Sequence, residues 1–206
     1  MAQSLPRQQL ENWVKSLEIT AGKVLDIGGS QLPINGRVKV WEVEEYRILD
    51  LPKPHENRQA PDIAMDINFP PEKQLSMVEM EVAKSEFDVV FALELSEYLW
   101  NPAMAVANMN KFLKMYGKLY MSFHFNYPVH QIIEFDYLRY TKSGIKKIMD
   151  ECGFKIEEMT PRTCAMNTGY QELMGFYSKQ GMKWAKGSDE HTATGYLIKA
   201  IKIKNL

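Results

Sequence analysis

Residues 87–93, Phe-Asp-Val-Val-Phe-Ala-Leu, form an almost unbroken apolar run of strand length. Such runs are typical of strands that are buried on both faces, as in a parallel sheet covered by helices. Shorter apolar segments of the same kind lie at 24–27, 46–51, 62–67 and 118–123, and most of them end at a glycine, a proline or an acidic residue. Because helical segments alternate with these strands, the pattern predicts an open, largely parallel α/β sheet covered on both sides.

Three segments have the periodicity of helices. The first, at 4–16, places apolar residues three and four apart on one face. The others are predicted at 102–117, where a proline occupies the first turn, and at 143–152. Two more strands are predicted at 154–156 and 195–203. Apolar and basic residues largely alternate in the last one, which favours a place near an edge of the sheet.

The length of 206 residues is that of one ordinary domain. We therefore expect a single domain over residues 1–206, with an N-terminal helix within 1–20. Residues 161–194 lack clean periodicity. We expect them to form an insertion or lid region between the last two strands; loops with a short helix around 172–177 are the alternative.

The charge balance gives no support to a nucleic-acid substrate. Lysine and arginine number 25, aspartate and glutamate number 26, and the formal net charge is −1. Proteins that bind a phosphate backbone usually carry a clear basic excess. We therefore expect no nucleic-acid partner.

The two cysteines, Cys152 and Cys164, make no disulfide framework and favour a reducing compartment. The N-terminus lacks an apolar core of signal-peptide length, and no segment reaches the roughly 18 apolar residues that span a bilayer. We expect a cytoplasmic protein without membrane insertion.

Acidic residues stand at the predicted carboxyl ends of four strands, which is where open parallel sheets bind ligands. They are Asp26, Asp50, Asp66 and Glu94. Carboxylates can accept hydrogen bonds from ribose hydroxyls, and they attract a cationic sulfonium or ammonium group. The four positions therefore indicate a site for a ligand with these groups.

The first of these strand ends also carries a glycine pair, Gly28-Gly29, followed by Ser-Gln-Leu-Pro at 30–33. Glycines allow the backbone to approach a cofactor closely. A dinucleotide site would need two further glycines, so the turn gives little support to a pyrophosphate cradle.

In order and spacing, these segments resemble the motifs of the class I S-adenosylmethionine-dependent methyltransferases, and the small type 11-like domains in particular. The strand and turn at 24–30 match the first motif, Asp50 the second, Asp66-Ile67 the third and residues 87–102 the fourth. The resemblance covers about residues 22–156. It implies a Rossmann-like three-layer sandwich with a mostly parallel seven-stranded sheet and an antiparallel last strand.

The resemblance also implies S-adenosylmethionine as the cofactor. In the family, the residue matched by Asp50 bonds the ribose hydroxyls and the residue matched by Asp66 lies near the adenine, although Asp62 and Asn68 compete for the latter role. The sequence departs from the family at two places: the turn lacks a later glycine, and Tyr98 stands where a histidine is common. The expected cofactor-binding residues are Asp26, Gly28, Gly29, Ser30, Asp50, Asp66, Ile67, Leu93 and Glu94.

The candidate catalytic residues are His124, Glu94 and Tyr98. His124 follows the fifth strand on the ligand side, and an imidazole titrates in the range that a general base needs. Glu94 ends a buried strand, where burial of a carboxylate without a binding partner is energetically unfavourable. The aromatic face of Tyr98 could attract a sulfonium. We expect the acceptor between these three residues, under a lid partly supplied by the first helix. His130 is an alternative base, and no metal site is expected.

Each assignment has a structural alternative. Asp26 could cap the turn, Asp50 could be a solvated turn residue, and Tyr98 could simply pack in the core. Methyl transfer to a nucleophilic acceptor can proceed by positioning alone, in which case His124 is not needed as a base.

The leading hypothesis is a methyltransferase acting on a small-molecule acceptor by O- or N-methylation, with a sugar or another metabolite as the acceptor. The alternative is a non-catalytic S-adenosylmethionine-binding module with the same fold. A nicotinamide-dependent oxidoreductase would need a pyrophosphate turn and a Tyr-x-x-x-Lys pair, and neither stands at the expected place. A nucleic-acid methyltransferase would favour Asn-Pro-Pro-Tyr after the fourth strand, and this motif is absent there as well. The acceptor and the oligomeric state are left open.

Overall fold

The computed structural model describes residues 4–54, 59–76, 86–129, 133–163 and 193–206. Several predictions fall outside these residues: those for Cys164, for His130, for the short helix at 172–177 and for most of the region 161–194.

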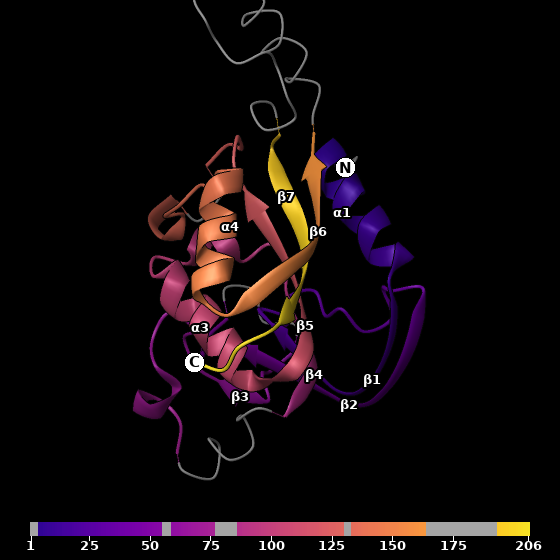
Figure 1. The fold of residues 1–206 in the computed structure, drawn as a ribbon, viewed down its shortest axis with the longest axis vertical. Coiled ribbons are helices and arrows are strands. Elements are labelled where there is room, and N and C mark those ends of the chain that lie inside the picture. The colour runs from indigo at the N-terminus through magenta and orange to yellow at the C-terminus, as the bar shows by residue number, and fades with distance from the viewer. Residues whose placement is uncertain (1–3, 55–58, 77–85, 130–132, 164–192) are drawn as a thin grey trace, which may run out of the picture.

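Within the described residues, seven strands form one sheet in the order β3-β2-β1-β4-β5-β7-β6 (Figure 1). Strands β1 to β5 run parallel to their neighbours among themselves, whereas β7 runs antiparallel to both β5 and β6. This topology confirms the predicted Rossmann-like fold with its antiparallel last strand. The strands are β1 (Glu18–Ile27), β2 (Val40–Asp50), β3 (Ile63–Ala64), β4 (Phe87–Ala92), β5 (Leu113–His124), β6 (Phe154–Arg162) and β7 (Gly195–Lys202).

The three predicted helices are α1 (Leu5–Ser16), α3 (Pro102–Phe112) and α4 (Lys142–Glu151). Each begins after a residue whose side-chain oxygen accepts a backbone N–H of the first turn, and these residues are Ser4, Asn101 and Thr141. Short 3₁₀ turns lie at Pro71–Lys73, Ser96–Tyr98 and Ile133–Phe135.

Helix α3 is shorter than predicted, because it ends at Phe112 and β5 follows without a loop. The chain turns inside β5 instead. Tyr116 adopts a φ of +65°, and a Cβ at Gly117 would lie 2.9 Å from the carbonyl oxygen of Lys114. The register with β4 shifts at this point, as at a β-bulge. The apolar periodicity of residues 102–117 therefore belongs to two elements, a helix as far as Phe112 and a strand from Leu113 onward.

Strand β3 is also shorter than the predicted 62–67. The carboxylate of Asp62 accepts the N–H of Ile48 at 2.7 Å, so this residue caps the sheet edge with its side chain. After Met65, whose N–H donates to the Asp50 carbonyl at 2.9 Å, the chain leaves the sheet. The residues that follow are free to line a cavity.

Helices cover both faces of the sheet, with α3 and α4 on one face and α1 on the other (Figure 1). Leu10 and Val14 of α1 are fully buried in one apolar core, together with Phe91 of β4. The adjacent Val90 belongs to the core under α3 and α4. Successive side chains of a strand point to opposite faces, so β4 supplies both cores. The apolar run at this strand is thereby explained.

Strand β7 lies second from the edge, between β5 and the edge strand β6. Its basic residues do not all face solvent, since Lys202 is only 1% exposed. The ammonium of Lys202 donates to the carbonyl oxygens of Asn110 and Leu113, both at 2.7 Å. It thereby caps the carboxyl end of α3.

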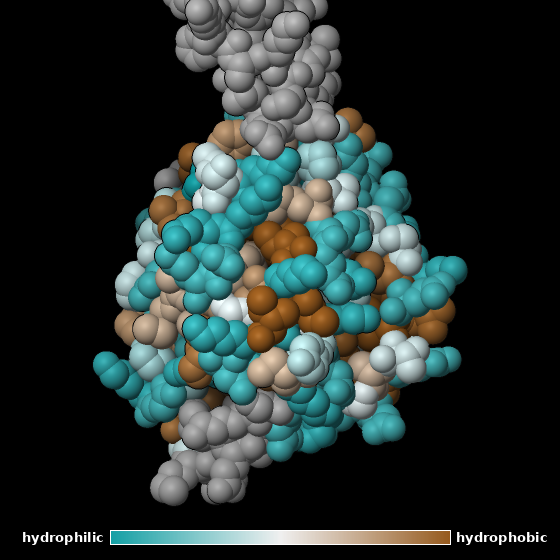
Figure 2. Space-filling view, in the orientation of Figure 1, coloured by the Kyte–Doolittle hydropathy of each residue, from teal (hydrophilic) through white to brown (hydrophobic). Residues whose placement is uncertain are grey.

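In the described part of the chain, every helix is too short or too polar to cross a bilayer. The face drawn in Figure 2 is mostly hydrophilic, with apolar side chains in small groups.

Candidate functional site

The turn after β1 brings the backbone close to two cavities. Gly28 has a φ of +79°, a conformation that favours glycine, and its N–H donates to the carbonyl of Leu49 at 2.8 Å. A Cβ at Gly29 would lie 2.5 Å from a carboxylate oxygen of Asp26. Both glycines are therefore required where they stand, although the turn lacks the later glycine of the family pattern.

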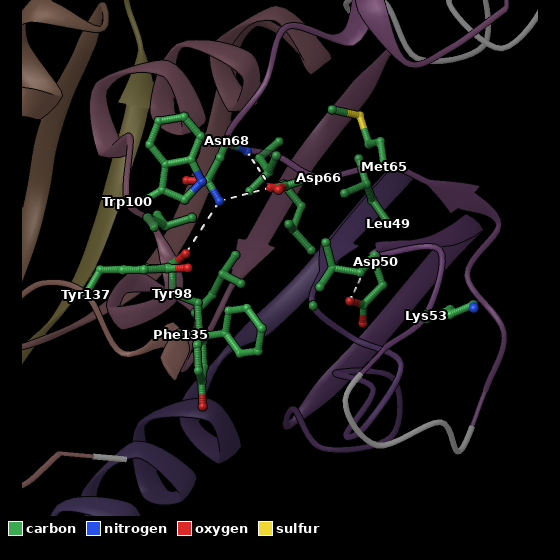
Figure 3. A pocket seen from close by; sticks show the side chains of 16 residues that line it. Leu49, Asp50, Lys53, Met65, Asp66, Asn68, Tyr98, Trp100, Phe135 and Tyr137 are labelled. Atoms are coloured by element: carbon green, nitrogen blue, oxygen red, sulfur yellow. Dashed lines mark hydrogen bonds between the residues drawn. The ribbon is translucent and has the colours of Figure 1, made fainter. Parts of the chain in front are cut away.

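The first cavity, cavity 1, has a volume of about 310 Å³ and lies over the carboxyl ends of β1, β2 and β3. Figure 3 shows Leu49, Asp50 and Met65 on one side, with aromatic side chains opposite them. The aromatic residues that line it are Tyr98, Trp100, Phe135 and Tyr137. A cavity of this size and apolar character is typical of a small-ligand site.

Asp50, at the end of β2, lines cavity 1. Its two carboxylate oxygens accept the N–H of Leu51 at 2.8 Å and the N–H of Ser30 at 3.2 Å. These bonds tie β2 to the glycine turn and fix the orientation of the carboxylate. Each oxygen retains lone pairs for a ligand hydroxyl.

Asp66 and Ile67 also line cavity 1, beyond the end of β3. One oxygen of Asp66 accepts both the N–H and the side-chain amide of Asn68, each at 2.9 Å. The Asn68 oxygen in turn accepts the N–H of Asn101 at 3.2 Å. Asn68 therefore joins the β3 end to the start of α3. Asp62, the other competitor of Asp66 for the place near the adenine, lies at the sheet edge instead.

The second cavity, cavity 2, has a volume of about 370 Å³ and lies between α1, the glycine turn and the end of β4. Gly28 lines both cavities, so they adjoin at this residue. Residues of both charges line cavity 2, among them Arg7, Asp26, Arg37 and Glu94.

The two arginines of cavity 2 were not predicted. Arg7 and Arg37 share the carboxylate of Glu11 at 2.9 and 2.8 Å. Arg7 is on α1 and Arg37 follows the glycine turn, so only the packing of α1 against that turn brings them together. The sequence carries no local signal for this contact.

Asp26 is almost fully buried, and it lines cavity 2. One of its oxygens accepts the N–H of Ile34 at 2.8 Å and the hydroxyl of Tyr46 at 2.7 Å. Burial raises the pKa of Asp26 to about 6, against the opposing effect of these two hydrogen bonds. The residue thus supports the loop and also faces the cavity.

Glu94 follows β4 with a φ of +52°, a strained conformation for a residue other than glycine. Its carboxylate pairs with the guanidinium of Arg162 at 2.6 and 3.3 Å and accepts the hydroxyl of Ser122 at 2.9 Å. Burial raises the pKa of Glu94, but the charges of Arg162 and His124 and the hydrogen bonds outweigh it and lower the pKa to about 2. Glu94 is therefore a carboxylate at any physiological pH.

His124 lies behind Glu94 and lines neither cavity. Its Nδ1 is 3.0 Å from the carboxylate of Glu97, and its Nε2 is 3.7 Å from that of Glu94. The three candidate catalytic residues are thus divided, because Tyr98 lines cavity 1, Glu94 lines cavity 2 and His124 is 2% exposed.

Among the described residues, no group of three or more histidine, cysteine, aspartate or glutamate side chains is arranged to hold a metal ion.

No protein-family model and no curated protein matches the chain. Solved structures do match it. A proposed methyltransferase from Bacillus halodurans C-125 is 16% identical, with a TM-score of 0.58 over 95% of this chain and 98% of that chain. Phosphoethanolamine N-methyltransferase 2 of Haemonchus contortus, solved with S-adenosyl-L-methionine, is 14% identical, with a TM-score of 0.55 over 96% of this chain and 52% of that chain. The [4+2]-cyclase SpnF is 12% identical, with a TM-score of 0.56 over 95% and 80%.

Proposed function

We propose that this chain, which has the fold of the class I S-adenosylmethionine-dependent methyltransferases, binds S-adenosylmethionine across its two adjoining cavities and transfers the methyl group to a small-molecule acceptor. The observation that carries the proposal is the junction of the cavities at Gly28, with a nucleoside-sized space on one side and a site of mixed charge on the other.

Cavity 1 suits the adenosyl half of the cofactor. The carboxylate of Asp50 would accept the ribose hydroxyls, since its backbone hydrogen bonds already fix its orientation. The adenine would lie near Asp66 and Ile67, facing the aromatic side of the cavity. This assignment matches what the motif resemblance implies for the same residues.

Cavity 2 suits the amino-acid end, which is a zwitterion. Its carboxylate would lie near the guanidinium of Arg7 or Arg37, and its ammonium near the carboxylates of Asp26 or Glu94. A site with charges of only one sign would repel one end of this group. The mixture therefore supports an α-amino acid better than a simple anion.

The bound cofactor would supply an activated methyl group on a sulfonium. The residues of this chain would hold the sulfonium near Gly28, which has no side chain of its own to keep the backbone away from a ligand. Positioning the acceptor in line with the carbon–sulfur bond then supplies much of the rate acceleration. An oxygen or nitrogen atom of the acceptor would receive the methyl group.

A binding module without turnover is the second candidate. It is favoured by the pairing of Glu94 with Arg162 and by the burial of His124, which shield both candidate bases. The [4+2]-cyclase of the same fold illustrates that this fold hosts other reactions. Turnover with any acceptor, detected as release of S-adenosylhomocysteine, separates the two candidates.

Calorimetric titration tests the cofactor assignment. We expect micromolar binding of S-adenosylmethionine and S-adenosylhomocysteine and no binding of NAD. Asp50→Asn should weaken both adenosyl ligands at least tenfold, because one acceptor oxygen for the ribose is lost. Asp62→Asn is the matched control, since Asp62 also accepts a backbone N–H but lies outside cavity 1. Equal affinities for the two variants would refute the ribose assignment.

A further inference from the structure

Tyr46 contacts the carboxylate of Asp26 in cavity 2, although no motif suggested it. The parallel pairing of β1 and β2 places Asp26 opposite Ile48. Residues two apart on a strand share a face of the sheet, so Tyr46 lies on the same face as Ile48, diagonally across from Asp26. Its hydroxyl donates to Oδ2 of Asp26 at 2.7 Å. Tyr46 itself does not line cavity 2, so it acts on a ligand there through Asp26.

The two carboxylate oxygens of Asp26 have different surroundings. Oδ2 accepts the hydroxyl of Tyr46 and also the N–H of Ile34 at 2.8 Å. Oδ1 accepts no hydrogen bond from the described residues, and it is not fully enclosed. Because Asp26 lines cavity 2, Oδ1 is the oxygen that a ligand in this cavity can reach.

The two carboxylates that line cavity 2 differ in how far their charge is compensated. Glu94 pairs with the guanidinium of Arg162 at 2.6 and 3.3 Å. The donors to Asp26 are a phenol and a backbone N–H, and both are uncharged. A cationic ligand group is therefore attracted more strongly to Asp26 than to Glu94.

We propose that Tyr46 is a positioning residue for Asp26: its hydroxyl stabilises the ionised carboxylate and holds Oδ1 toward cavity 2, where Oδ1 binds the α-ammonium group of the cofactor. This inference rests on the proposed binding of S-adenosylmethionine. It assigns the ammonium to Asp26 rather than to Glu94.

The ionisation of Asp26 is balanced closely enough for one hydrogen bond to matter. Burial raises the pKa of Asp26 to about 6, against the opposing effect of the hydrogen bonds from Tyr46 and Ile34. The charged groups that face Asp26 are Arg7, Arg37, Asp50 and Glu94. Burial and the charge of Asp26 raise the pKa of Tyr46, so its hydroxyl keeps its proton and remains a donor.

A pH dependence confined to the amino-acid end of the ligand tests the inference. S-adenosylhomocysteine carries the α-ammonium group, whereas methylthioadenosine has the same adenosyl half without the amino-acid end. Between about pH 5 and pH 7.5 this ammonium stays charged, since α-amino groups titrate near pH 8. Protonation of Asp26 removes its negative charge. The affinity for S-adenosylhomocysteine relative to methylthioadenosine should therefore fall as the pH drops through about 6.

Calorimetric titration of both ligands over this pH range compares the variants. In Tyr46→Phe the midpoint of the affinity ratio should move upward by at least about half a pH unit, because one hydrogen bond to the ionised form is lost. At pH 6 this corresponds to a loss of S-adenosylhomocysteine affinity of about twofold or more, with methylthioadenosine unaffected. Asp26→Asn should make the ratio independent of pH.

Tyr120→Phe is the matched control. Tyr120 is also a buried tyrosine, but it stacks on Phe91 in the core under α1, and both affinities should match those of the unaltered protein. An unchanged midpoint in Tyr46→Phe, an equal loss of both ligands, or the full pH dependence in Asp26→Asn would overturn the inference. Binding of both ligands with a ratio independent of pH would overturn it alone, whereas binding of neither would refute the proposed function as well.

Discussion

The ion pair between Glu94 and Arg162 allows a stability effect to be worked out from the structure. Arg162 is 1% exposed and the side chain of Glu94 is 22% exposed, so water screens the pair only weakly. The pKa of Glu94 is lowered from 4.5 to about 2. At about 1.4 kcal/mol per pKa unit, this difference corresponds to about 3 kcal/mol of folding free energy. Breaking a buried pair on one side typically costs about 3–5 kcal/mol, which agrees.

The sign of the pH dependence follows from the lowered pKa. A carboxylate that ionises more readily in the folded state stabilises the fold above its unfolded pKa of 4.5, and this contribution is lost as the pH falls toward 2. Glu94→Gln mimics the protonated side chain. We therefore expect it to destabilise the protein by about 3 kcal/mol at pH 7 and by much less near pH 3.

Urea denaturation followed by circular dichroism at both pH values measures the effect. Glu151→Gln is the control, because its ion pair with Lys147 is exposed and should contribute under about 0.5 kcal/mol. In a double-mutant cycle, adding Arg162→Met to Glu94→Gln should cost less than the sum of the single changes. A cost below about 1 kcal/mol at pH 7, or an equal cost at both pH values, would refute the reasoning.

Three further predictions concern the glycine turn and the buried lysine. Asp26→Asn should stabilise the fold at pH 8 and leave its stability unchanged near pH 4, because the pKa of Asp26 is raised to about 6 and the ionised carboxylate becomes unfavourable as the pH rises through that value. The same change should weaken S-adenosylmethionine binding. Denaturation measures the first effect and calorimetry the second. Gly29→Ala should abolish measurable cofactor binding, because the new Cβ would displace the Asp26 carboxylate. Gly36→Ala is the control: it lies at an open position with a φ of +79° and should cost only about 1 kcal/mol of stability. Equal cofactor binding by the two variants would contradict the prediction. Lys202→Met should cost about 1–3 kcal/mol by removing the ammonium that donates to two buried carbonyls. The affinity for S-adenosylmethionine should be unchanged, and a lost affinity would mean that the buried ammonium acts on the site.

The strand ends could be predicted because two local signals coincide there. An apolar run marks each buried strand, and an acidic residue or glycine follows where the strand leaves the sheet, as at Asp26, Gly28 and Asp50. The apolar pattern gave the wrong end for the helix α3, because apolar residues continue past that end into β5 and the predicted helix therefore included Tyr116. They also overestimated β3, because Asp62 caps the sheet edge with its side chain.

The long-range contacts of the site could not be predicted in this way. Arg162 is 68 positions from Glu94, and the pair exists only because the end of β6 comes close to the turn after β4. The pairing of Glu97 with His124 likewise needs two strand ends to be adjacent. Neither local periodicity nor residue type contains that information, so Arg162 and Glu97 were identified only from the fold, although their partners Glu94 and His124 were predicted from the sequence.

The most direct test of the account is a crystal structure of the protein with S-adenosylhomocysteine. We predict the ribose on Asp50, the thioether beside Gly28 and the amino-acid group in cavity 2, with its carboxylate toward Arg7 or Arg37. A ligand bound elsewhere, or both cavities empty at saturating ligand, would contradict the account.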